Sequence, residues 1–320
     1  MKKNILFLFL LVPITNHVFA TIWRVNNNPG IVANFTTAQA AHDDASPGDT
    51  LHFEPSVNSY GFLSLSKRLV LISLGSFLPE NTGLQYTSIT ASLTGINMNA
   101  GAANSVLMVN TTGNINISNT NNVTLLRCRT VNISLVGADN ILLLNSFIEG
   151  SIFSNSGSTG NIFSNNIIRA VFNIQLGSAA TVTNNVIGQT ANASCTFNNC
   201  VIQNNIFVNP ALDILGASNV FQNNLSAGNQ LPGGNTNAVN MNNVFVNSAG
   251  LVDNAFVLQT AVANPAQGAG VGGIDCGAFG GGTPFVLGLI PPIPSIFKLQ
   301  APVTPVGNSM QVIISTRSNN

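Results

Sequence analysis

Residues 161–186 read NIFSNNIIRAVFNIQLGSAATVTNNV, and this stretch decides the fold because its pattern returns at a fixed interval. In it, a pair of asparagines is followed by an apolar residue, and the same triplet recurs every 19 or 20 residues as far as residue 244. The five pairs are Asn165-Asn166, Asn184-Asn185, Asn204-Asn205, Asn223-Asn224 and Asn242-Asn243. A constant period of this length, built from short apolar runs and small polar turns, is typical of a solenoid.

Each repeat contains three short runs of strand-forming residues, which in the first unit are 162–163, 167–168 and 171–176. The runs are too short for helices, and β-branched and aromatic residues dominate them. Asn, Ser and Gly separate the runs, and these residues favour bends. Stacked turns would pair each strand with its copy at a spacing of about 4.8 Å. The sequence therefore predicts an all-β fold, a single-stranded parallel β-helix of about ten to twelve turns.

The asparagine pairs have a physical use at a corner of such a helix. An inward-facing amide can donate to the turn on one side and accept from the turn on the other, so that stacked amides form a ladder. We expect the ten paired asparagines to build this ladder, with Asn145-Ser146 one step earlier. The sequence does not decide which asparagine of a pair faces inward, because apolar residues occupy both following positions. The alternative is that asparagine recurs only as a turn former in an asparagine-rich chain.

Residues 1–20 have the features of a secretory signal peptide. Lys2 and Lys3 precede an apolar run at 5–12, and Val18-Phe19-Ala20 offers a cleavage site. The run is too short to span a membrane, and no other stretch is long enough. We therefore expect a mature chain that begins near Thr21 and is secreted or held at the bacterial cell surface.

Charge excludes some classes of partner. Only 6% of the residues are charged, against about 25% in ordinary domains. Removing the two leader lysines would leave eight basic residues against ten acidic ones, a net charge of about −2. The absence of a basic patch argues against nucleic acid as a partner. An uncharged surface of amides and hydroxyls suits a neutral polysaccharide or a cell-surface glycan, and we expect a monomer.

Residues 22–55 are predicted to cap the solenoid, with a strand at 23–25, a helix within 35–45 and a strand at 50–53. Asn34 or Thr36 could cap the helix, and His42, Asp43 and Asp44 would lie on its solvated face. FTTAQAA at 35–41 and PGDTLHF at 47–53 resemble the amino-terminal cap of secreted bacterial pectin-lyase-like proteins. NPAQGAG at 264–270 and GIDCGAFG at 273–280 resemble their terminal segment.

This resemblance implies a right-handed parallel β-helix that occupies residues 21–285 as one domain, with closing coils at 257–285. It also implies that Asp275 binds backbone amides of the last turn. Residues 286–320 change character, with a proline-rich segment at 290–294 and a strand at 309–316. We expect them to form a β-hairpin that caps the last coil. The alternative is a tail for surface attachment or export.

Pectin-lyase-like proteins include polysaccharide lyases and glycoside hydrolases, so the resemblance raises the question of catalysis. Hydrolases need neighbouring carboxylates, and the lyases use a basic residue with acids that hold calcium. Here the acids of the coils are isolated: Asp139, Glu149, Asp213, Asp253 and Asp275. We therefore expect no catalytic residue and no cofactor. The predicted function is an exported, non-catalytic protein that is structural or binds glycans, and the alternative is a lyase or hydrolase with an unfamiliar site.

One charged cluster remains as a candidate ligand site. Its members are Arg127 and Arg129, which lie one repeat before Glu149, and Arg169, which lies one repeat after it. They could bind sugar, or Glu149 and Arg169 could simply be cross-strand neighbours worth about 0.2–1 kcal/mol.

The cysteines and the one histidine on a coil strand are the remaining candidates for a disulfide or a metal site. Cys195 and Cys200 are close enough in sequence for a disulfide, whereas Cys128 is expected in the core. No spacing suggests a metal site. His52 is expected at the surface.

Overall fold

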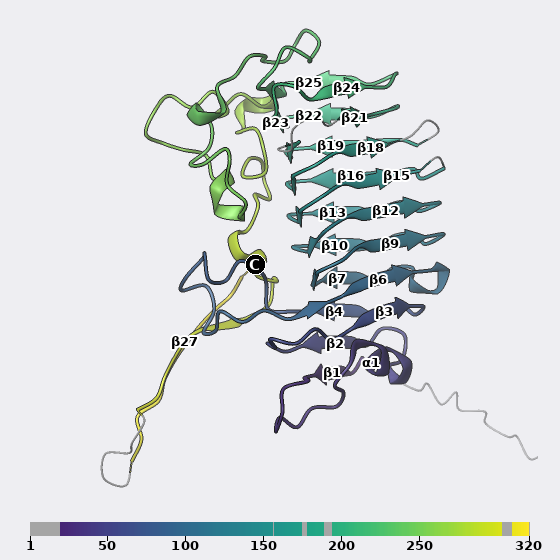
Figure 1. Cartoon of the computed structure of the whole chain (residues 1–320), viewed down its shortest axis with the longest axis vertical. Helices are drawn as coiled ribbons and strands as arrows, with labels where there is room; N and C mark the ends of the chain where they lie inside the picture. The colour runs from purple at the N-terminus through teal and green to yellow at the C-terminus, as the bar shows by residue number, and fades with distance from the viewer. Residues whose placement is uncertain (1–19, 156, 175–177, 189–193, 303–308, 320) are drawn as a thin grey trace, which may run out of the picture.

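The computed structural model describes residues 20–155, 157–174, 178–188, 194–302 and 309–319. It confirms the predicted parallel β-helix: the chain winds through three parallel sheets, and each strand pairs with the strand one turn further along (Figure 1). Of the predicted leader, only Ala20 lies within the described residues. Among the described helices, none is long and apolar enough to cross a membrane.

The longest sheet, sheet A, has ten parallel strands, which mark about nine turns rather than the ten to twelve predicted. In order they are β1 (Ile22–Val25), β2 (Thr50–Phe53), β4 (Val70–Ile72), β7 (Val106–Met108), β10 (Thr124–Leu126), β13 (Leu142–Leu144), β16 (Asn161–Ser164), β19 (Ala180–Thr183), β22 (Val201–Gln203) and β25 (Val220–Gln222).

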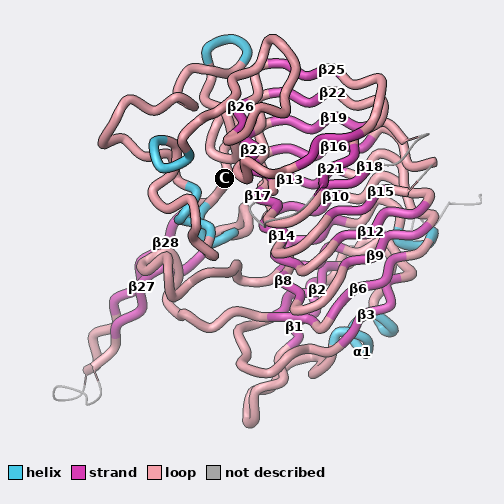
Figure 2. The backbone as a smooth tube through the Cα atoms, turned by 45° about the horizontal axis from the view of Figure 1, so that its top comes forward, coloured by secondary structure: helices cyan, strands magenta, loops and turns pink. Residues whose placement is uncertain are grey.

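Two shorter sheets of eight strands complete each turn (Figure 2). Sheet B consists of β3 (Phe62–Leu65), β6 (Gly95–Met98), β9 (Ile115–Ser118), β12 (Ile133–Val136), β15 (Ile152–Ser154), β18 (Phe172–Ile174), β21 (Ser194–Thr196) and β24 (Asp213–Leu215). Sheet C consists of β5 (Ser92–Leu93), β8 (Asn110–Thr111), β11 (Arg129–Thr130), β14 (Phe147–Ile148), β17 (Ile167–Ile168), β20 (Val186–Ile187), β23 (Ile206–Phe207) and β26 (Leu225–Ser226).

The core inside the solenoid follows from the alternation of side chains along each strand. The middle residue of each sheet A strand faces inward, so that Leu125, Leu143 and Phe163 stack in register and are fully buried. Phe163 packs edge to face on Phe172 with ring centroids 4.8 Å apart, and Phe172 packs in the same way on Phe197 at 5.5 Å. Such aromatic pairs add to the stabilisation that burial alone provides.

The predicted N-terminal cap is present, with one correction to its start and one to its surface. Helix α1 (Ala38–Asp44) covers the first turn and buries Ala38 and Ala41, as its apolar spacing predicts. Its N-cap is Thr37, whose hydroxyl accepts from the Ala40 amide, rather than Asn34 or Thr36. His42 is buried, and only the two aspartates that follow it are exposed.

Residues 266–290, which we call the strap, do not form closing coils, and this prediction is wrong. The strap runs back along the outside of the solenoid and covers the outer face of sheet C (Figure 1). A second hydrophobic core lies between them, separate from the core inside the solenoid. Sheet C contributes Phe147, Ile167, Val186, Ile206 and Leu225, and the strap contributes Ala266, Cys276, Ala278, Phe285 and Leu289.

Short 3-10 helices punctuate the irregular segments. They are η1 (Ala100–Ala102), η2 (Met241–Asn243), η3 (Asp253–Phe256), η4 (Val271–Gly273) and η5 (Leu287–Leu289). Of these, η2 and η3 add Met241, Ala255 and Phe256 to the second core.

The predicted C-terminal hairpin is confirmed, but it does not lie over the last coil. Strands β27 (Ser295–Gln300) and β28 (Ile313–Arg317) pair antiparallel and project from the lower half of the molecule in Figure 1. The hairpin base is held by residues 73–91, a long connection between β4 and β5: the Tyr86 amide donates to the Ile296 carbonyl at 3.1 Å, and Arg317 donates to the Leu84 carbonyl at 2.6 Å. At the last turn, Leu231 joins the core inside the solenoid instead.

Candidate functional site

The corner between sheets A and C resolves the question of which asparagine faces inward. The second residue of each pair, from Asn166 to Asn224, is fully buried. Along this inner row, each Nδ2 donates to the Oδ1 of the next turn: Asn166 to Asn185 at 3.0 Å, Asn185 to Asn205 at 2.9 Å and Asn205 to Asn224 at 2.9 Å. Each Oδ1 also accepts the backbone amide of the inner residue one turn earlier. The predicted amide ladder is therefore present, and the second asparagine builds it.

The ladder ends differently from its prediction. Its last rung is Asn235, whose Oδ1 accepts from Nδ2 of Asn224 at 2.8 Å. Asn242 and Asn243 lie in η2 and are exposed, so the prediction that they belong to the ladder is wrong. Ser146 holds the rung before Asn166, as its spacing predicts, because its amide donates to Oδ1 of Asn166 at 2.9 Å.

The first asparagine of each pair forms an outer row at the same corner. Asn145, Asn165, Asn184, Asn204 and Asn223 all have φ between 49° and 58°, the left-handed region that asparagine tolerates better than most residues. This conformation turns the chain from sheet A into sheet C. It also leaves the first amide free to point away from the core, while the second points into it.

The outer row binds the strap rather than a ligand. Asn223 donates to the Ala269 carbonyl at 2.8 Å, Asn184 to the Asp275 carbonyl at 3.2 Å and Asn145 to the Thr283 carbonyl at 2.9 Å. Asn165 donates to the carbonyls of both Ala278 and Gly280, at 2.9 and 2.7 Å. Residue numbers in the strap rise as the turns descend, so the strap runs antiparallel to the axis of the solenoid.

Arg127 continues this outer row one turn further down. It has φ 54°, is almost fully buried and donates to the carbonyls of Ile290 and Asn319. Burial lowers the pKa of its guanidinium. Arg127 is therefore placed to hold the C-terminal segment and is unavailable to a sugar at the surface.

Of the other members of the predicted charged cluster, Arg129 lies on the same turn as Arg127, and Glu149 and Arg169 lie on the next two turns. Arg129 pairs with Glu149 at 2.6 Å, with each side chain about one-third exposed. Arg129 also donates to Ser76 and stacks 4.3 Å above the Phe77 ring, so it anchors the connection at 73–91. Glu149 and Arg169 follow strands β14 and β17, whose register places them one above the other, as predicted. Arg127 and Arg129 therefore hold neighbouring segments of the chain in place.

Most of the coil carboxylates, which are isolated from one another in the sequence, bind backbone amides. Asp275 accepts from the Gly268 amide at 2.9 Å, so it binds a backbone amide as expected, but that amide lies in the strap and not in the last turn of the solenoid. Asp139 accepts from the Thr159 amide at 2.7 Å. Asp213 is exposed on β24 at the end of sheet B.

Asp253 is a buried carboxylate under the strap. It accepts from Asn81 Nδ2 and the Asn254 amide, both at 2.8 Å, and from the Gly288 amide at 2.6 Å. Burial raises the pKa of this carboxyl, and the three hydrogen bonds act against that rise. Asp253 therefore joins the connection at 73–91, η3 and the strap at one point.

The histidines have structural surroundings. His42 Nε2 accepts from the Ser66 amide at 3.1 Å, and Nδ1 lies 2.9 Å from Asp43. The Ser66 hydroxyl is 3.3 Å from Nε2. Both polar groups of Ser66 therefore lie at the same ring nitrogen, and His42 joins α1 to the residue that follows β3. Burial lowers the pKa of His52, which lines a cavity of about 190 Å³ together with Tyr86.

All four cysteines are free and buried, so the predicted disulfide between Cys195 and Cys200 is wrong. The sulfur of Cys195 accepts a hydrogen bond from the Phe172 amide, and the thiol of Cys200 donates one to the Asn198 carbonyl. Burial raises the pKa of the Cys195 thiol to about 12 and that of Cys200 to about 11. Cys128 lies in the core, as predicted. Among the described residues, no group of three His, Cys, Asp or Glu side chains could hold a metal ion.

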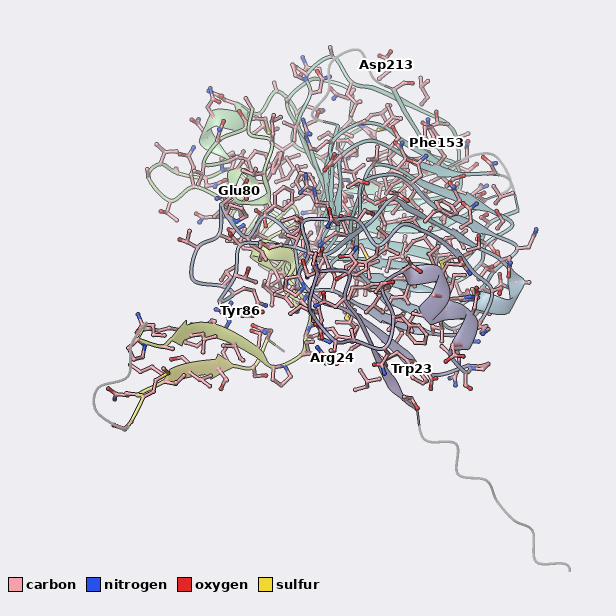
Figure 3. The ribbon with its side chains drawn as sticks, turned by 60° about the horizontal axis from the view of Figure 1, so that its bottom comes forward. Trp23, Arg24, Glu80, Tyr86, Phe153 and Asp213 are labelled. Atoms are coloured by element: carbon pink, nitrogen blue, oxygen red, sulfur yellow. The ribbon has the colours of Figure 1, made fainter. Side chains whose placement is uncertain are left out.

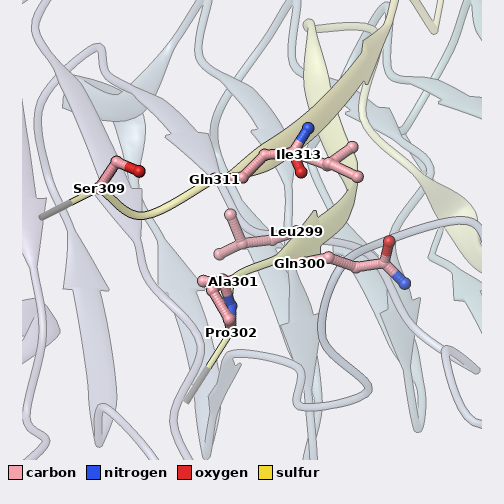
Figure 4. Close-up of a pocket in the computed structure, with 7 residues that line it drawn as sticks. All are labelled: Leu299, Gln300, Ala301, Pro302, Ser309, Gln311 and Ile313. Carbon is pink, nitrogen blue, oxygen red and sulfur yellow. The ribbon is translucent and has the colours of Figure 1, made fainter. Parts of the chain in front are cut away.

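Two concavities of the described residues offer little chemistry. A concavity of about 850 Å³ lies between the strands of the hairpin, and none of its lining residues titrates (Figure 4). A second one of about 560 Å³ lies where Leu84, Phe279 and Arg317 meet. Its walls are mainly apolar and belong to the strap and the hairpin base.

The outer face of sheet B is an extended, uncharged polar surface. A column of outward side chains crosses it in register: Ser64, Asn97, Asn116, Ser134, Phe153 and Asn173. Nδ2 of Asn116 donates to Oδ1 of Asn97 at 2.8 Å, and Nδ2 of Asn132 donates to Oδ1 of Asn114 at 3.0 Å. Phe62 and Phe153 are exposed to 46 and 39%, and Figure 3 shows Phe153 on the side of the solenoid away from the hairpin.

No site is predicted on this face above, although the sequence carries a signal for it. The runs GINM at 95–98 and INIS at 115–118 alternate apolar residues with asparagine, which predicts a polar outer face. In the strands from β3 to β21 of sheet B there is no charged residue. The outer face of sheet A is more apolar. Strands β4 and β13 present valine, isoleucine and leucine on it, β16 presents an isoleucine and a serine, and β19 presents two threonines.

A comparison of this chain with protein-family models, with curated proteins and with solved structures finds no match.

Proposed function

We propose that this chain is an exported, non-catalytic β-helix protein of the pectin-lyase-like kind, which binds a neutral polysaccharide along the outer face of sheet B. The observation that carries the proposal is the column from Ser64 to Asn173, in which five of the six turns present an amide or a hydroxyl and the remaining turn presents the exposed Phe153, with Phe62 exposed on the first of these strands. Amides and hydroxyls both donate and accept, so they match sugar hydroxyls of either role.

The spacing of the face supports a linear ligand. Strands in the sheet are about 4.8 Å apart, so Phe62 on β3 and Phe153 on β15 are separated by four steps, or about 19 Å along the axis. An extended glycan of several units could lie between them. The aromatic rings offer flat apolar surface to sugar rings, while Asn97 and Asn116 supply hydrogen bonds between them.

The surroundings of the carboxylates support a non-catalytic role. An acid or base needs a carboxylate that is free to exchange a proton with substrate. Asp139 and Asp275 each accept a backbone amide, and Glu149 pairs with Arg129. On the face of sheet B, the one charged strand residue is Asp213, at the far end from Phe62.

A binding screen with variants on two faces tests the site. The purified chain is offered neutral glucans, mannans and galactans, with polygalacturonate and alginate as acidic probes. We expect retention on a neutral glycan, and at least a tenfold loss of affinity in the double variant Asn116→Ala/Phe153→Ala. Leu251→Ala, which also truncates an exposed apolar side chain but in the segment before the strap, should bind normally.

Three outcomes would contradict the proposal. Retention on none of the neutral glycans would remove the ligand class. Loss of binding in Val201→Lys, on the outer face of sheet A, with normal binding in the sheet B variant would move the site. Release of unsaturated or reducing ends from pectin, alginate or a glycosaminoglycan would make the protein a lyase or hydrolase instead.

A further inference from the structure

The carboxylate of Asp49 is a buried acid that lacks a cationic side chain. It is 3% exposed, and it accepts from Trp23 Nε1 at 2.8 Å, the Ser46 amide at 2.9 Å and the Thr21 amide at 2.8 Å. In the described part of the chain, no Lys, Arg or His side chain forms an ion pair with it. Buried charges in proteins are normally paired, so Asp49 is an exception that asks for a counter-charge.

The charge state of this carboxyl is settled by its neighbours. Burial alone would raise its pKa, but the hydrogen bonds from Thr21, Trp23 and Ser46 outweigh burial, and the pKa is lowered. Asp49 is therefore ionised at neutral pH. It presents Oδ1 to a single donor, the nitrogen of Thr21.

Register fixes Thr21 beside Asp49. Strand β1 pairs parallel with β2, with Ile22 opposite Thr50, so the residues that precede them are also neighbours. The Thr50 amide donates to the Thr21 carbonyl at 2.8 Å, which holds Thr21 from its other side. Ala20 and Thr21 are both exposed, so the bond between them is open to a peptidase.

We propose that hydrolysis of the Ala20–Thr21 bond leaves the α-ammonium of Thr21 as the counter-charge of Asp49, so that removal of the leader completes the N-terminal cap. A leader peptidase and one water molecule cleave the amide: Ala20 gains a carboxylate, and the nitrogen of Thr21 becomes an amine. An α-amino group has a pKa of about 7.7–8.0, so at neutral pH it is mostly an ammonium. This inference rests on the export that we propose.

The nitrogen does not need to move for this to happen. It already lies 2.8 Å from Oδ1 of Asp49 as an amide, and cleavage adds a positive charge and two further donors at the same place. A charge-assisted hydrogen bond at this distance is stronger than the neutral one that it replaces. A chain that begins at Thr21 should therefore be more stable than any form that carries residues before Thr21.

Melting temperature measures this directly on the full mature chain. Three forms are prepared from a cleavable fusion: one that starts at Thr21, one that retains Ala20, and the Thr21 form acetylated at its α-amino group. At pH 6.5 and low salt we expect the free Thr21 form to melt about 2–4 °C above the other two. In Asp49→Asn the three forms should melt together. Equal melting temperatures of the free and acetylated wild-type forms would overturn the proposal, and this comparison needs no substitution.

The single tryptophan gives a second readout, because Trp23 and Thr21 both donate to the carboxylate of Asp49. The ion pair raises the pKa of the ammonium, so the added stability is complete below about pH 7.7 and is lost as the pH rises through the higher folded value. We expect Trp23 emission of the free form to titrate in this range, whereas the acetylated form stays constant. Identical titrations of the two forms would also overturn the proposal.

Export itself is tested separately, by N-terminal sequencing of the protein collected outside the producing cell. A first residue of Thr21 is expected, and a different first residue would overturn the proposal. Failure to bind glycans would remove the proposed ligand but would leave the Thr21–Asp49 pair untouched. The two proposals therefore fail by different measurements.

Discussion

The two asparagines of each pair are adjacent in the chain, yet they hold different parts of the molecule together. The inner row, from Asn166 to Asn224, joins each turn to the next through buried amides. The outer row, from Asn145 to Asn223, joins the solenoid to the strap. Two asparagines that are adjacent in the chain therefore have different roles: the second of each pair stabilises the solenoid core, and the first attaches the strap. This contrast can be tested, because the two rows should fail in different ways.

The largest effect is expected in the inner row. The side chain of Asn185 makes five hydrogen bonds, and Asn185→Ala leaves the Asn166 backbone amide without its acceptor, removes one acceptor of Asn166 Nδ2 and removes one of the two donors to Oδ1 of Asn205. Each buried group left unpaired costs about 1–3 kcal/mol, so we expect a loss of about 3–5 kcal/mol. Urea unfolding followed by circular dichroism measures it. Asn185→Asp is the matched variant: it keeps the shape but loses the donors, and it should be no more stable than the alanine. A loss below about 1 kcal/mol would show that the ladder contributes little.

The next effect separates the strap from the coils. A Cβ at Gly280 would lie 1.8 Å from the Asp275 carbonyl oxygen, which is backbone and cannot yield easily. We expect Gly280→Ala to detach the strap and uncover Phe147, Ile167 and Val186 while the turns remain. Binding of a dye that fluoresces on apolar surfaces should rise, and the far-ultraviolet circular dichroism should stay. Gly282→Ala, where a Cβ meets nothing within 4 Å, is the control. Unchanged dye binding in Gly280→Ala would contradict the strap geometry.

The outer row should respond more weakly and locally. Asn165→Ala removes two hydrogen bonds to the strap and places alanine at φ 57°, whereas Asn165→Gly removes the same bonds without the strain. We expect the alanine to lose about 1–2 kcal/mol more than the glycine. Hydrogen exchange should quicken in the strap but not in β16 to β20. Equal exchange in strap and coils would mean that the two rows act as one unit.

A smaller effect should depend on pH, through Asp253 beneath the strap. Burial raises the pKa of this carboxyl in the folded state, so its stabilising contribution is complete below the unfolded pKa of about 3.9 and is lost as the pH rises through the folded value. The stability of the wild type relative to Asp253→Asn should therefore fall as the pH rises from 4 to 7. Urea midpoints of the two proteins at several pH values measure the difference. A relative stability that rises over this range would reverse the assigned direction.

The smallest effect is expected at the fifth pair, which marks the edge of the comparison. Asn242 and Asn243 are exposed in η2, and Asn243→Ala should change stability by less than about 0.5 kcal/mol. Thermal unfolding beside Asn224→Ala, which stands at the same place one period earlier, provides the contrast. A loss in Asn243→Ala similar to that in Asn224→Ala would extend the ladder beyond Asn235.

The sequence predicts the solenoid well because a stacked fold repeats its chemistry at each turn. The three runs of one repeat became β16, β17 and β18 within a few residues, and the period located the corner. The two residues after each pair are buried, and in all but the Leu225-Ser226 case both are apolar. The reason is visible only in three dimensions. In the pair Ile167-Ile168, Ile168 faces the core inside the solenoid and Ile167 faces the strap. The repeat therefore supplies the apolar residues of the second core. The strap that covers them has no repeating sequence pattern, so its position could not be predicted.

The incorrect predictions have related causes. Asn242-Asn243 keeps the spacing, but the regular turns end at β26, and Asn235 takes the next rung after only 11 residues. Cys195 and Cys200 are near in sequence, yet each packs into the core with its own backbone partner. Arg127 looked like a surface charge because nothing local shows that Ile290, 163 residues away, will cover it. Of the proposed glycan face, only the alternation of asparagine with isoleucine could be read in advance.

The strap also fixes the order in which this protein can be completed. Synthesis proceeds from the N-terminus at about 5–20 residues per second, so the turns emerge well before the segment that shields them. The contacts of Asn165 with Ala278 and of Asn145 with Thr283 span 113 and 138 residues. Until those last residues arrive, a row of phenylalanine, isoleucine, valine and leucine side chains is open to neighbouring chains and to aggregation. The nascent chain therefore passes through an interval in which this apolar row is exposed, and the interval ends only when residues 266–290 have been made.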